Sequence, residues 1–468
     1  MRKAMLVVAL TAAFAVGVVG AALAHLDFGL QEQQFLAANS QPLFGVAKPL
    51  EASSQTDLEA PIADPLSLVT LAKHLSARVV STPAEADNVD MIALWPNDVN
   101  PTYLIACNEA DPEDPGLIRI NIATGAWETI LSGTQDCDPA HVTPWGTVVF
   151  GEENGTDGRF WELIDPLNTT DVALVNGVPS GGTNPDNIVE RPALGHLSFE
   201  GIGVLPSGVV YYGDENRPDQ GTPGGPYFKF IPDTLRTDTD PIDDLSDSPL
   251  VDGSVYGMRL GLRENDDDVP NADYGQGTQT GRGIWIPANV DPFPDLRAVA
   301  ADLKLTGYYR PEDLSIDPVE LAEDNVRFCG NDTGNEGTDA NYGETICVTD
   351  GTLDEAGTPD STPEVQFFVL GNPELAMMDN IAYQSGRGNW VLHEDGDQVL
   401  GNNDLWDCLP DGADDNLLSD GCIRVGTLND LDAEWTGGVF DASGTHFFVS
   451  VQHSDTDTGV VLEITGWK

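Results

Sequence analysis

The sequence of 468 residues is poor in basic side chains. It has 21 Lys and Arg residues against 77 Asp and Glu residues, which gives a formal net charge of -56 at pH 7. This charge argues against nucleic acids, anionic membrane surfaces and polyanionic substrates held by side-chain charge alone. It favours divalent cations, high-salt surroundings, or both, although most of these acids must form a solvated surface.

Several motifs of common enzyme chemistries are absent from the sequence. It has no Gly-x-Ser-x-Gly, no phosphate-binding Gly-Lys-Ser/Thr loop, no His-Glu-x-x-His and no Cys-x-x-Cys, and its seven histidines do not cluster. Zinc and nicotinamide chemistry are therefore disfavoured. A chain rich in acids and poor in histidine points to calcium bound by oxygen, with a thiolate-assisted transition metal as a possible addition.

Long apolar runs are also missing, except at the N-terminus. Met1, Arg2 and Lys3 precede an apolar run over residues 4–24 that ends in Ala-Leu-Ala. This pattern predicts a secretory signal peptide, 1–24, cut before His25, with an uncleaved membrane anchor as the alternative. There is no twin-arginine pair. We therefore expect a periplasmic or extracellular protein that has no contact with a membrane once the signal is cleaved.

Cysteine is scarce, but the number is even. Six cysteines in an exported chain suggest three disulfides. Two local bridges are predicted, and Cys107 and Cys137 are then left either to pair or to leave Cys137 free for another role. The predicted local pairs are Cys329 with Cys347 and Cys408 with Cys422.

The β pattern begins near residue 88. The sequence has 49 Gly and 32 Pro and few long apolar runs of helical period, which argues against a helical protein. Short apolar strands recur as hairpins with Gly-containing turns, and repeated hairpins indicate blades around a central channel. We predict an all-β β-propeller over 88–468, with residues 233–305 largely an insertion on one face. We expect residues 25–87 to form an N-terminal arm.

The hairpins share an acidic residue at the head of the first strand. If these strands line the channel, their carboxylates point at its axis, where they can coexist only with cations. The alternative is that such acids cap turns or face solvent. Arg310 lies close to one of them, and the adjacent acids Glu152 and Glu153 follow another strand and suit a hard cation. The predicted ring consists of Glu200, Glu312, Asp379 and Glu434.

Several of these segments together resemble the PhoX family of secreted alkaline phosphatases. The likeness spans roughly residues 88–460 in the family's order, and Thr-Pro-Trp-Gly-Thr with the paired glutamates and Arg-Pro-Glu-Asp are its more specific parts. The matching segments are Cys137, residues 143–147, Glu152-Glu153, residues 199–201, residues 300–302, residues 310–313, Asp379-Asn380 and residues 451–453.

The resemblance implies a six-bladed propeller whose channel holds an iron and calcium cluster that hydrolyses phosphomonoesters. Cys137 would be the thiolate ligand of iron, and Arg310 would hold the phosphate. The implied metal-binding acids are Glu153 or its neighbour Glu152, Glu200, Glu312 and Asp379. Glu434 is added from the hairpin repeat and not from the family.

The sequence leaves more than one function open. The first hypothesis is an exported phosphatase that acts on small phosphate esters, and the second is a non-catalytic surface or binding protein stabilised by calcium. A lactonase or esterase that uses one calcium also fits a carboxylate ring. The state of Cys137 separates the first two, because a free thiolate near Glu153 favours the enzyme and a disulfide to Cys107 favours the scaffold. The oligomeric state stays open.

Overall fold

The computed structural model describes residues 28–58, 64–219, 222–261, 279–288, 295–335, 341–396, 401–412, 416–454 and 458–468. The predicted signal peptide and its cut site before His25 lie outside these residues. No helix within the described ranges combines the length and the apolar character needed to cross a bilayer.

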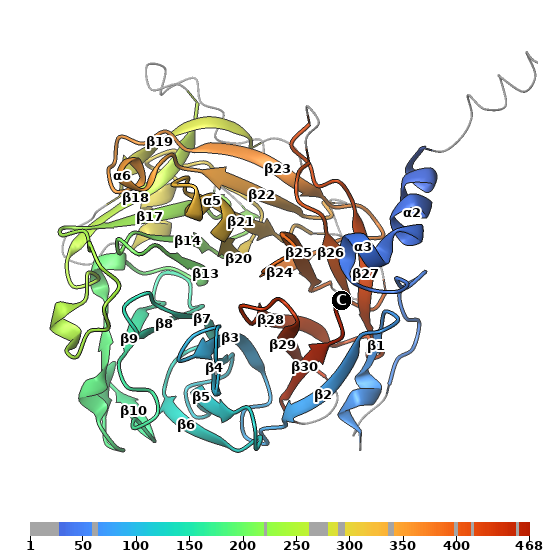
Figure 1. Cartoon of the computed structure of the whole chain (residues 1–468). Helices are drawn as coiled ribbons and strands as arrows, with labels where there is room; N and C mark the ends of the chain where they lie inside the picture. Colours follow the sequence, from blue (N-terminus) through green and yellow to red (C-terminus); the bar gives the residue numbers. More distant parts are fainter. Residues whose placement is uncertain are drawn as a thin grey trace, which may run out of the picture.

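The described chain consists mainly of antiparallel sheets arranged like the blades of a propeller, so the all-β prediction is confirmed (Figure 1). One sheet has the order β11-β10-β6-β5-β4-β3, and the next has the order β12-β9-β8-β7. Their strands are β3 (Val89–Trp95), β4 (Tyr103–Asn108), β5 (Pro115–Asn121), β6 (Trp127–Ser132), β7 (Cys137–Val142), β8 (Val148–Glu152), β9 (Phe160–Leu163), β10 (Val172–Val175), β11 (Val178–Ser180) and β12 (Ile188–Glu190).

The middle of the chain forms one sheet of nine strands in the order β13-β14-β17-β18-β19-β23-β22-β21-β20. The segment predicted as an insertion contributes β18 and β19 to this sheet. The nine strands are β13 (Phe199–Val204), β14 (Val210–Asp214), β17 (Tyr227–Pro232), β18 (Gly253–Leu260), β19 (Gly281–Pro287), β20 (Pro311–Ile316), β21 (Arg327–Asp332), β22 (Glu344–Thr349) and β23 (Glu364–Leu370).

The C-terminal part forms two more sheets, and each takes its outermost strand from the N-terminal region. Their orders are β1-β27-β26-β25-β24 and β2-β30-β29-β28. The segment predicted as an N-terminal arm therefore contributes a strand to each. The strands are β1 (Val69–Leu71), β2 (Ser76–Ser81), β24 (Met378–Gln384), β25 (Asn389–Glu394), β26 (Asp404–Cys408), β27 (Cys422–Leu428), β28 (Glu434–Phe440), β29 (His446–Gln452) and β30 (Val460–Thr465).

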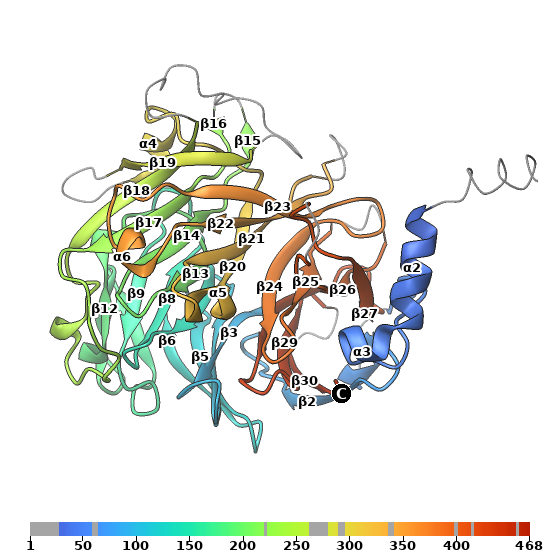
Figure 2. The same ribbon diagram turned by 45° about the horizontal axis from the view of Figure 1, so that its top comes forward.

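The remaining described elements are short. Figure 2 shows the two-stranded ribbon β15–β16 and helix α4 near each other at one edge of the molecule. They are β15 (Pro218–Asp219), β16 (Thr222–Pro223), the α-helices α2 (Phe28–Ala38), α3 (Ser40–Phe44), α4 (Leu296–Ala300), α5 (Pro318–Ala322) and α6 (Leu353–Ala356), and the 3-10 helices η1 (Pro65–Leu68), η2 (Pro185–Asn187), η3 (Pro192–Leu194) and η4 (Leu245–Asp247).

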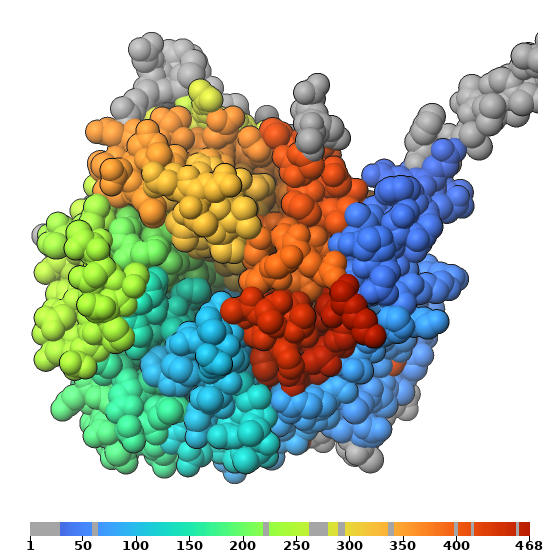
Figure 3. All heavy atoms as spheres, viewed as in Figure 1, coloured from blue at the N-terminus to red at the C-terminus, as the bar shows by residue number. Residues whose placement is uncertain are grey.

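Six strands surround the middle of the molecule. Each of β3, β7, β13, β20, β24 and β28 contacts the next, and β28 contacts β3, so the ring is closed (Figure 1). On the face in Figure 3, the blue segment around β3 meets the red C-terminal segment. Pairing of β2 with β30, from Ser76 opposite Thr465 onwards, joins the two ends of the chain in one sheet. This pairing covers a sheet edge that would otherwise be open to other chains.

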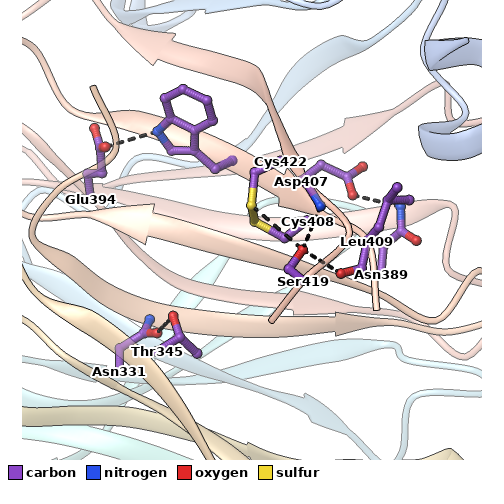
Figure 4. Close-up of a disulfide and its surroundings, with 11 residues drawn as sticks. Asn331, Thr345, Asn389, Glu394, Asp407, Cys408, Leu409, Ser419 and Cys422 are labelled. Atoms are coloured by element: carbon purple, nitrogen blue, oxygen red, sulfur yellow. Dashed lines mark hydrogen bonds between the residues drawn. A yellow bond between two sulfur atoms is a disulfide. The ribbon is translucent and has the colours of Figure 1, made fainter. Parts of the chain in front are cut away.

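Buried apolar residues form separate clusters between neighbouring sheets. One cluster joins Ile105 of β4 to Phe150 of β8, and it also contains the disulfide between Cys107 and Cys137. Burying each such large side chain stabilises the fold by about 1.5–3 kcal/mol. The two other disulfides, Cys329–Cys347 and Cys408–Cys422, are the local pairs that the sequence predicts, and each joins directly paired strands within a sheet. Figure 4 shows the bridge between Cys408 and Cys422.

Candidate metal centre

Five of the six ring strands carry an acidic residue in a β-bulge near their start. The register between each of these strands and its neighbour shifts where the acid stands, as between Phe199 and Ile202 in β13. A bulge inserts an extra residue and changes the direction of a side chain, which aims the carboxylates at the common axis. The five acids are Asp90, Asp138, Glu200, Glu312 and Asp379.

The sixth ring strand, β28, has glycine in the corresponding position. Its register shifts between Thr436 and Val439, and Gly437 has a φ of 64°. A Cβ atom on Gly437 would lie 2.2 Å from the carbonyl oxygen of Asp90, so no acid fits there. Glu434, at the start of β28, supplies the carboxylate of this strand instead.

The second residue of a bulge connects neighbouring ring strands. The Asp313 carboxylate accepts a hydrogen bond from the Ile381 backbone amide at 3.1 Å. The side-chain oxygen of Asn380 accepts one from the Gly437 amide at 3.0 Å. In the pairs Glu312-Asp313 and Asp379-Asn380, the first residue therefore faces the cavity, and the second bonds to the adjacent ring strand.

A further set of acids follows the second strand of four hairpins. These acids are adjacent to the residue that pairs with the ring strand, so they lie on the cavity side of the strand end. In the fifth hairpin the corresponding residue is Thr333, which donates a hydrogen bond to Glu312 at 3.0 Å. The four acids are Glu109, Glu153, Glu215 and Asp395.

Together these residues enclose an axial cavity of about 300 Å³. Eleven carboxylates line it against two arginines, so its described lining carries a large excess of negative charge. The lining residues are Asp90, Glu109, Asp138, Glu153, Glu200, Glu215, Arg217, Arg310, Glu312, Asp379, Asp395, Gly396, Asp432, Glu434, Gln452 and His453.

Mutual repulsion among these acids affects their titration. Burial, followed by the nearby acids, raises the pKa of Asp90 to about 8. Burial also raises the pKa of Glu312 to about 8, although the Arg310 charge lowers it. In Asp395, burial is outweighed by a hydrogen bond with Glu434 and by the Arg310 charge, and the net pKa is lowered. Cations in the cavity would remove this repulsion and favour the ionised carboxylates.

Arg310 lies among the acids at the entrance to β20. Its Nε is 2.8 Å from Glu215 Oε1 and 3.0 Å from Glu312 Oε1, and its Nη2 is 3.6 Å from Asp395 Oδ2. The residue has a φ of 57°, and its backbone oxygen accepts a hydrogen bond from the Thr333 amide at 3.0 Å. The guanidinium therefore faces the cavity from a backbone position that is fixed by the neighbouring strand.

The donor set fits a hard cation. Oxygens of Asp379, Asp395 and Glu434 lie within 4.8 Å of one another. Calcium binds oxygen at about 2.4 Å, so one ion can contact carboxylates separated by roughly twice that distance. The charged ligands around the cavity are carboxylates, and His453 lies at its edge with Nε2 3.1 Å from Glu434 Oε1.

The fold has a counterpart among solved structures. No protein-family model matches the chain, and no curated protein does. The chain is similar to PhoX of Pseudomonas fluorescens, solved in complex with vanadate, a transition state analogue, with a TM-score of 0.59, 16% identity and coverage of 88% of this chain and 98% of that chain. At this identity the likeness concerns the fold.

Two other similarities are weaker. One is to an aldose sugar dehydrogenase of Streptomyces coelicolor in its PQQ-bound form, with a TM-score of 0.42, 14% identity and coverage of 87% of this chain and 99% of that chain. The other is to a gluconolactonase of Xanthomonas campestris, with a TM-score of 0.40, 13% identity and coverage of 88% and 96%.

Most of the residues singled out in the sequence meet in the axial cavity. Arg310 lines it, and so do five of the predicted acids, although Glu434 enters from a position different from the other ring acids. The acids are Glu153, Glu200, Glu312, Asp379 and Glu434.

Two of the predicted ligands are not in the lining. Cys137 is bonded to Cys107, so its sulfur is not a thiolate, and the prediction of an iron ligand there is wrong. Successive side chains of β7 point to opposite faces of its sheet, so Cys137 points into the core while Asp138 points at the axis. Glu152 turns away from the cavity and accepts hydrogen bonds from the amides of Gln135 and Arg159 at 3.0 and 3.1 Å.

Sequence reasoning missed the rest of the acidic lining. Asp90 and Asp138 are the second residues of β3 and β7, and neither was predicted as a ligand. A search for an acid one residue after the strand start would have found both, because all five bulge acids share that place. Glu109, Glu215 and Asp395 stand at the polar ends of second strands, which the hairpin pattern contains but which were not assigned as ligands.

The motif at residues 143–147 has a structural role. Trp145 Nε1 donates to Glu162 Oε1 at 2.9 Å, and Thr147 Oγ1 donates to the same atom at 2.6 Å. Arg191 Nε lies 2.7 Å from the other oxygen of Glu162. This buried network fixes the turn between β7 and β8 and does not line the axial cavity.

Proposed function

We propose that this chain is an exported, metal-dependent hydrolase of phosphomonoesters that acts in the axial cavity. The observation that carries the proposal is Arg310, a fixed cation that faces a space otherwise lined by carboxylates. Carboxylates alone repel an anionic ester. A cavity that gathers cations and also presents a guanidinium is suited to bind a phosphate dianion.

The proposal includes a six-bladed propeller. The nine-stranded sheet contains two of the six ring strands, β13 and β20. Its two halves meet where β19 pairs with β23 over only Gly281–Arg282 and Glu364–Val365. We count these halves as two blades joined at their outer edges, which gives one blade for each ring strand.

Calcium is the cofactor that the oxygen ligands favour. The iron implied by the family resemblance would require oxygen ligands in this chain, because the thiolate is consumed in a disulfide. When bound, metal ions polarise the phosphoryl oxygens and lower the pKa of a coordinated water.

The chain's own groups bind and orient the ester. Arg310 contacts the phosphoryl oxygens through its planar fork and stabilises the charge that they carry in the transition state. Glu215 and Glu312, within 3.0 Å of its Nε, set the direction of the guanidinium. Thr333 fixes Glu312 by a hydrogen bond and thereby keeps one carboxylate oxygen directed into the cavity.

One observation favours a second function. The disulfide between Cys107 and Cys137 is the state expected of a non-catalytic, calcium-stabilised propeller that binds other molecules. Such a scaffold would need the acidic ring for its stability, but it would have no use for an arginine in the cavity.

Elemental analysis for calcium and iron, combined with a chromogenic phosphomonoester assay on the same preparation, tests the proposal. The enzyme hypothesis predicts bound metal and turnover that is lost with a chelator and restored by metal. Bound calcium without turnover of any phosphomonoester would establish the scaffold, and a protein without bound metal would refute both.

A further inference from the structure

One buried carboxylate behind the axial ring has an incomplete set of partners. In the hairpins that begin with β7, β20 and β24, the second-strand residue opposite the start of the ring strand is an acid that is buried and absent from the cavity lining. Glu152 and Glu394 occupy this place, and both oxygens of each accept hydrogen bonds from backbone amides. Asp332 occupies the same place opposite Pro311.

Asp332 differs in what it contacts. Its Oδ1 accepts a hydrogen bond from the Tyr227 hydroxyl at 3.2 Å. Its Oδ2 has no hydrogen-bond partner among the described residues, although only 2% of the residue is exposed. A buried carboxylate oxygen without a partner costs free energy, so its native partner is a species other than these protein groups.

A second acid lies directly across the sheet from it. Asp332 of β21 pairs in register with Glu344 of β22, and Glu344 is also buried, with 4% of it exposed. Like charges directly opposite each other destabilise a strand pair. The neighbouring pair fixes this register, because Thr345 Oγ1 donates to Asn331 Oδ1 at 2.7 Å (Figure 4).

The two acids share a small pocket with three other side chains, those of Gln279, Tyr309 and Asn341. All five side chains carry oxygen, and the lining contains no thiol and no imidazole. Burial, followed by the charge of Glu344, raises the pKa of Asp332 well above its usual range, because a buried acid next to a second acid favours its neutral form.

We propose that Asp332 and Glu344 bind a calcium-like divalent cation at a site separate from the axial cavity, with amide oxygens of Gln279 and Asn341 completing the ligands. Hard cations of this class take several carboxylate and amide oxygens. The site is distinct because successive side chains of a strand alternate: Thr333 points to Glu312 in the cavity, and Asp332 points to the other side. This inference does not depend on the proposed catalytic function.

The cation would also stabilise the segment that carries Arg310. The backbone oxygen of Arg310 accepts a hydrogen bond from the Thr333 amide, and that of Tyr309 accepts one from the Gly334 amide, at 3.0 and 3.1 Å. Both amides directly follow Asp332 in the chain. A metal that fixes Asp332 therefore fixes the backbone on which the axial arginine is mounted.

Terbium luminescence on the full chain tests the site. Tb³⁺ replaces calcium at oxygen sites and emits when a nearby tyrosine is excited. Tyr227 and Tyr309 adjoin this pocket, whereas the described axial lining contains no Tyr, Trp or Phe. We expect a saturable signal that calcium displaces. Asp332→Asn and Glu344→Gln should each weaken terbium binding at least tenfold.

Two control variants make the result specific. Asp407→Asn removes a fully buried acid of β26 and should leave the signal unchanged. Asp395→Asn alters the axial cavity and should lower axial calcium binding while the tyrosine-sensitised signal remains. Circular dichroism confirms that each variant is folded, and Glu344→Gln serves if Asp332→Asn does not fold.

Two results would overturn the proposal. The first is a signal in both Asp332→Asn and Glu344→Gln equal to that of Asp407→Asn. The second is a wild-type protein that gives no tyrosine-sensitised signal and is stabilised by Asp332→Asn without metal, since the two acids would then share a proton and not a cation.

Discussion

Arg310 occupies a place where its charge is almost wholly committed to nearby acids. Its guanidinium contacts Glu215, Glu312 and Asp395, and these contacts hold the pKa of Arg310 well above its usual range despite burial. Metal ions that bind the same acids would weaken these ion pairs and leave the Arg310 guanidinium available to a ligand in the cavity. An anion that enters the cavity would then contact both the metal ions and the arginine.

Arg310→Ala should lower kcat/KM for phosphomonoesters by roughly 10²–10³, a usual effect of removing one group that stabilises transition-state charge. Arg310→Lys should recover only part of this loss, because an ammonium group lacks the planar fork. Steady-state kinetics measured with saturating calcium check the expectation. Turnover that is the same in all three proteins would exclude Arg310 from phosphate binding.

Asp407 offers a pH test away from the cavity. Burial raises its pKa to about 7, and Asn389 donates a hydrogen bond to it at 2.8 Å. The folded protein therefore holds a proton that the unfolded chain loses near pH 4, and stability falls as the pH rises from about 4 to 7. The melting temperature of Asp407→Asn relative to wild type should increase between pH 5 and pH 8. A constant difference would contradict the raised pKa.

Single residues show how far the sequence could be interpreted. Glu200, Glu312 and Asp379 were predicted because each stands near the start of a short apolar strand in the recurring hairpin pattern. Asp90 stands in the same place in β3, but it was not included in the predicted ring. The partner of Cys137 could not be decided from sequence, because a disulfide with Cys107 and a thiolate bound to metal are both consistent with a cysteine at this position. Only the distance between β4 and β7 distinguishes the two alternatives.

At the scale of elements, the β-bulge directs one acid of each of five ring strands toward a common axis. A regular ring strand would alternate between the cavity and the core at every residue. The extra residue at the bulge lets Glu312 face the axis while Asp313 bonds the next ring strand. The sequence predicts the strands by their apolar pattern, but a bulge has no apolar signature and appears only in the register of paired strands.

The disulfide between β4 and β7 joins two neighbouring sheets. Replacing Cys107 and Cys137 together by alanine should destabilise the protein by about 3–4 kcal/mol, because the bridge closes a loop with a sequence separation of 30. Urea unfolding measures this loss. Metal content and turnover at low temperature should be unchanged, since the sulfur is not a ligand.

The bridge between Cys408 and Cys422 provides the matched control. It spans a separation of 14 within one sheet, and its removal should cost slightly less stability. Selective loss of iron on replacing Cys137, but not on replacing Cys408 and Cys422, would show that the sulfur binds metal in the native protein.

At the scale of the whole molecule, the net charge of -56 includes eleven acids gathered in the axial cavity. The sequence shows the excess of acids, but it does not distinguish the acids on the solvated surface from those that meet in the axial cavity. The acids of the cavity come from strands more than 300 residues apart in the chain, such as β3 and β28. The general fold was therefore predictable from local patterns, and the full membership of the cavity was not.

Removal of metal should lower the melting temperature of the whole propeller. A ligand present at about 100 times its Kd stabilises the folded state by roughly 2.7 kcal/mol, and a chelator removes that contribution. Differential scanning calorimetry with chelator, and then with excess calcium, measures the loss and the recovery. Sodium chloride at matched ionic strength controls for screening of the surface charge. A melting temperature that is indifferent to the chelator would contradict the metal centre.

Strand β2 cannot complete its pairing until β30, near the other end of the sequence, has been synthesised. Ser76 leaves the ribosome about 380 residues before Val460. At roughly 5–20 residues per second, the interval lasts from about 20 to 80 seconds. During that time the ring is a row of hairpins with two unpaired margins, and its acids are not yet gathered. If the axial acids bind metal as proposed, the complete centre can form only after β28 has joined β3 and closed the ring.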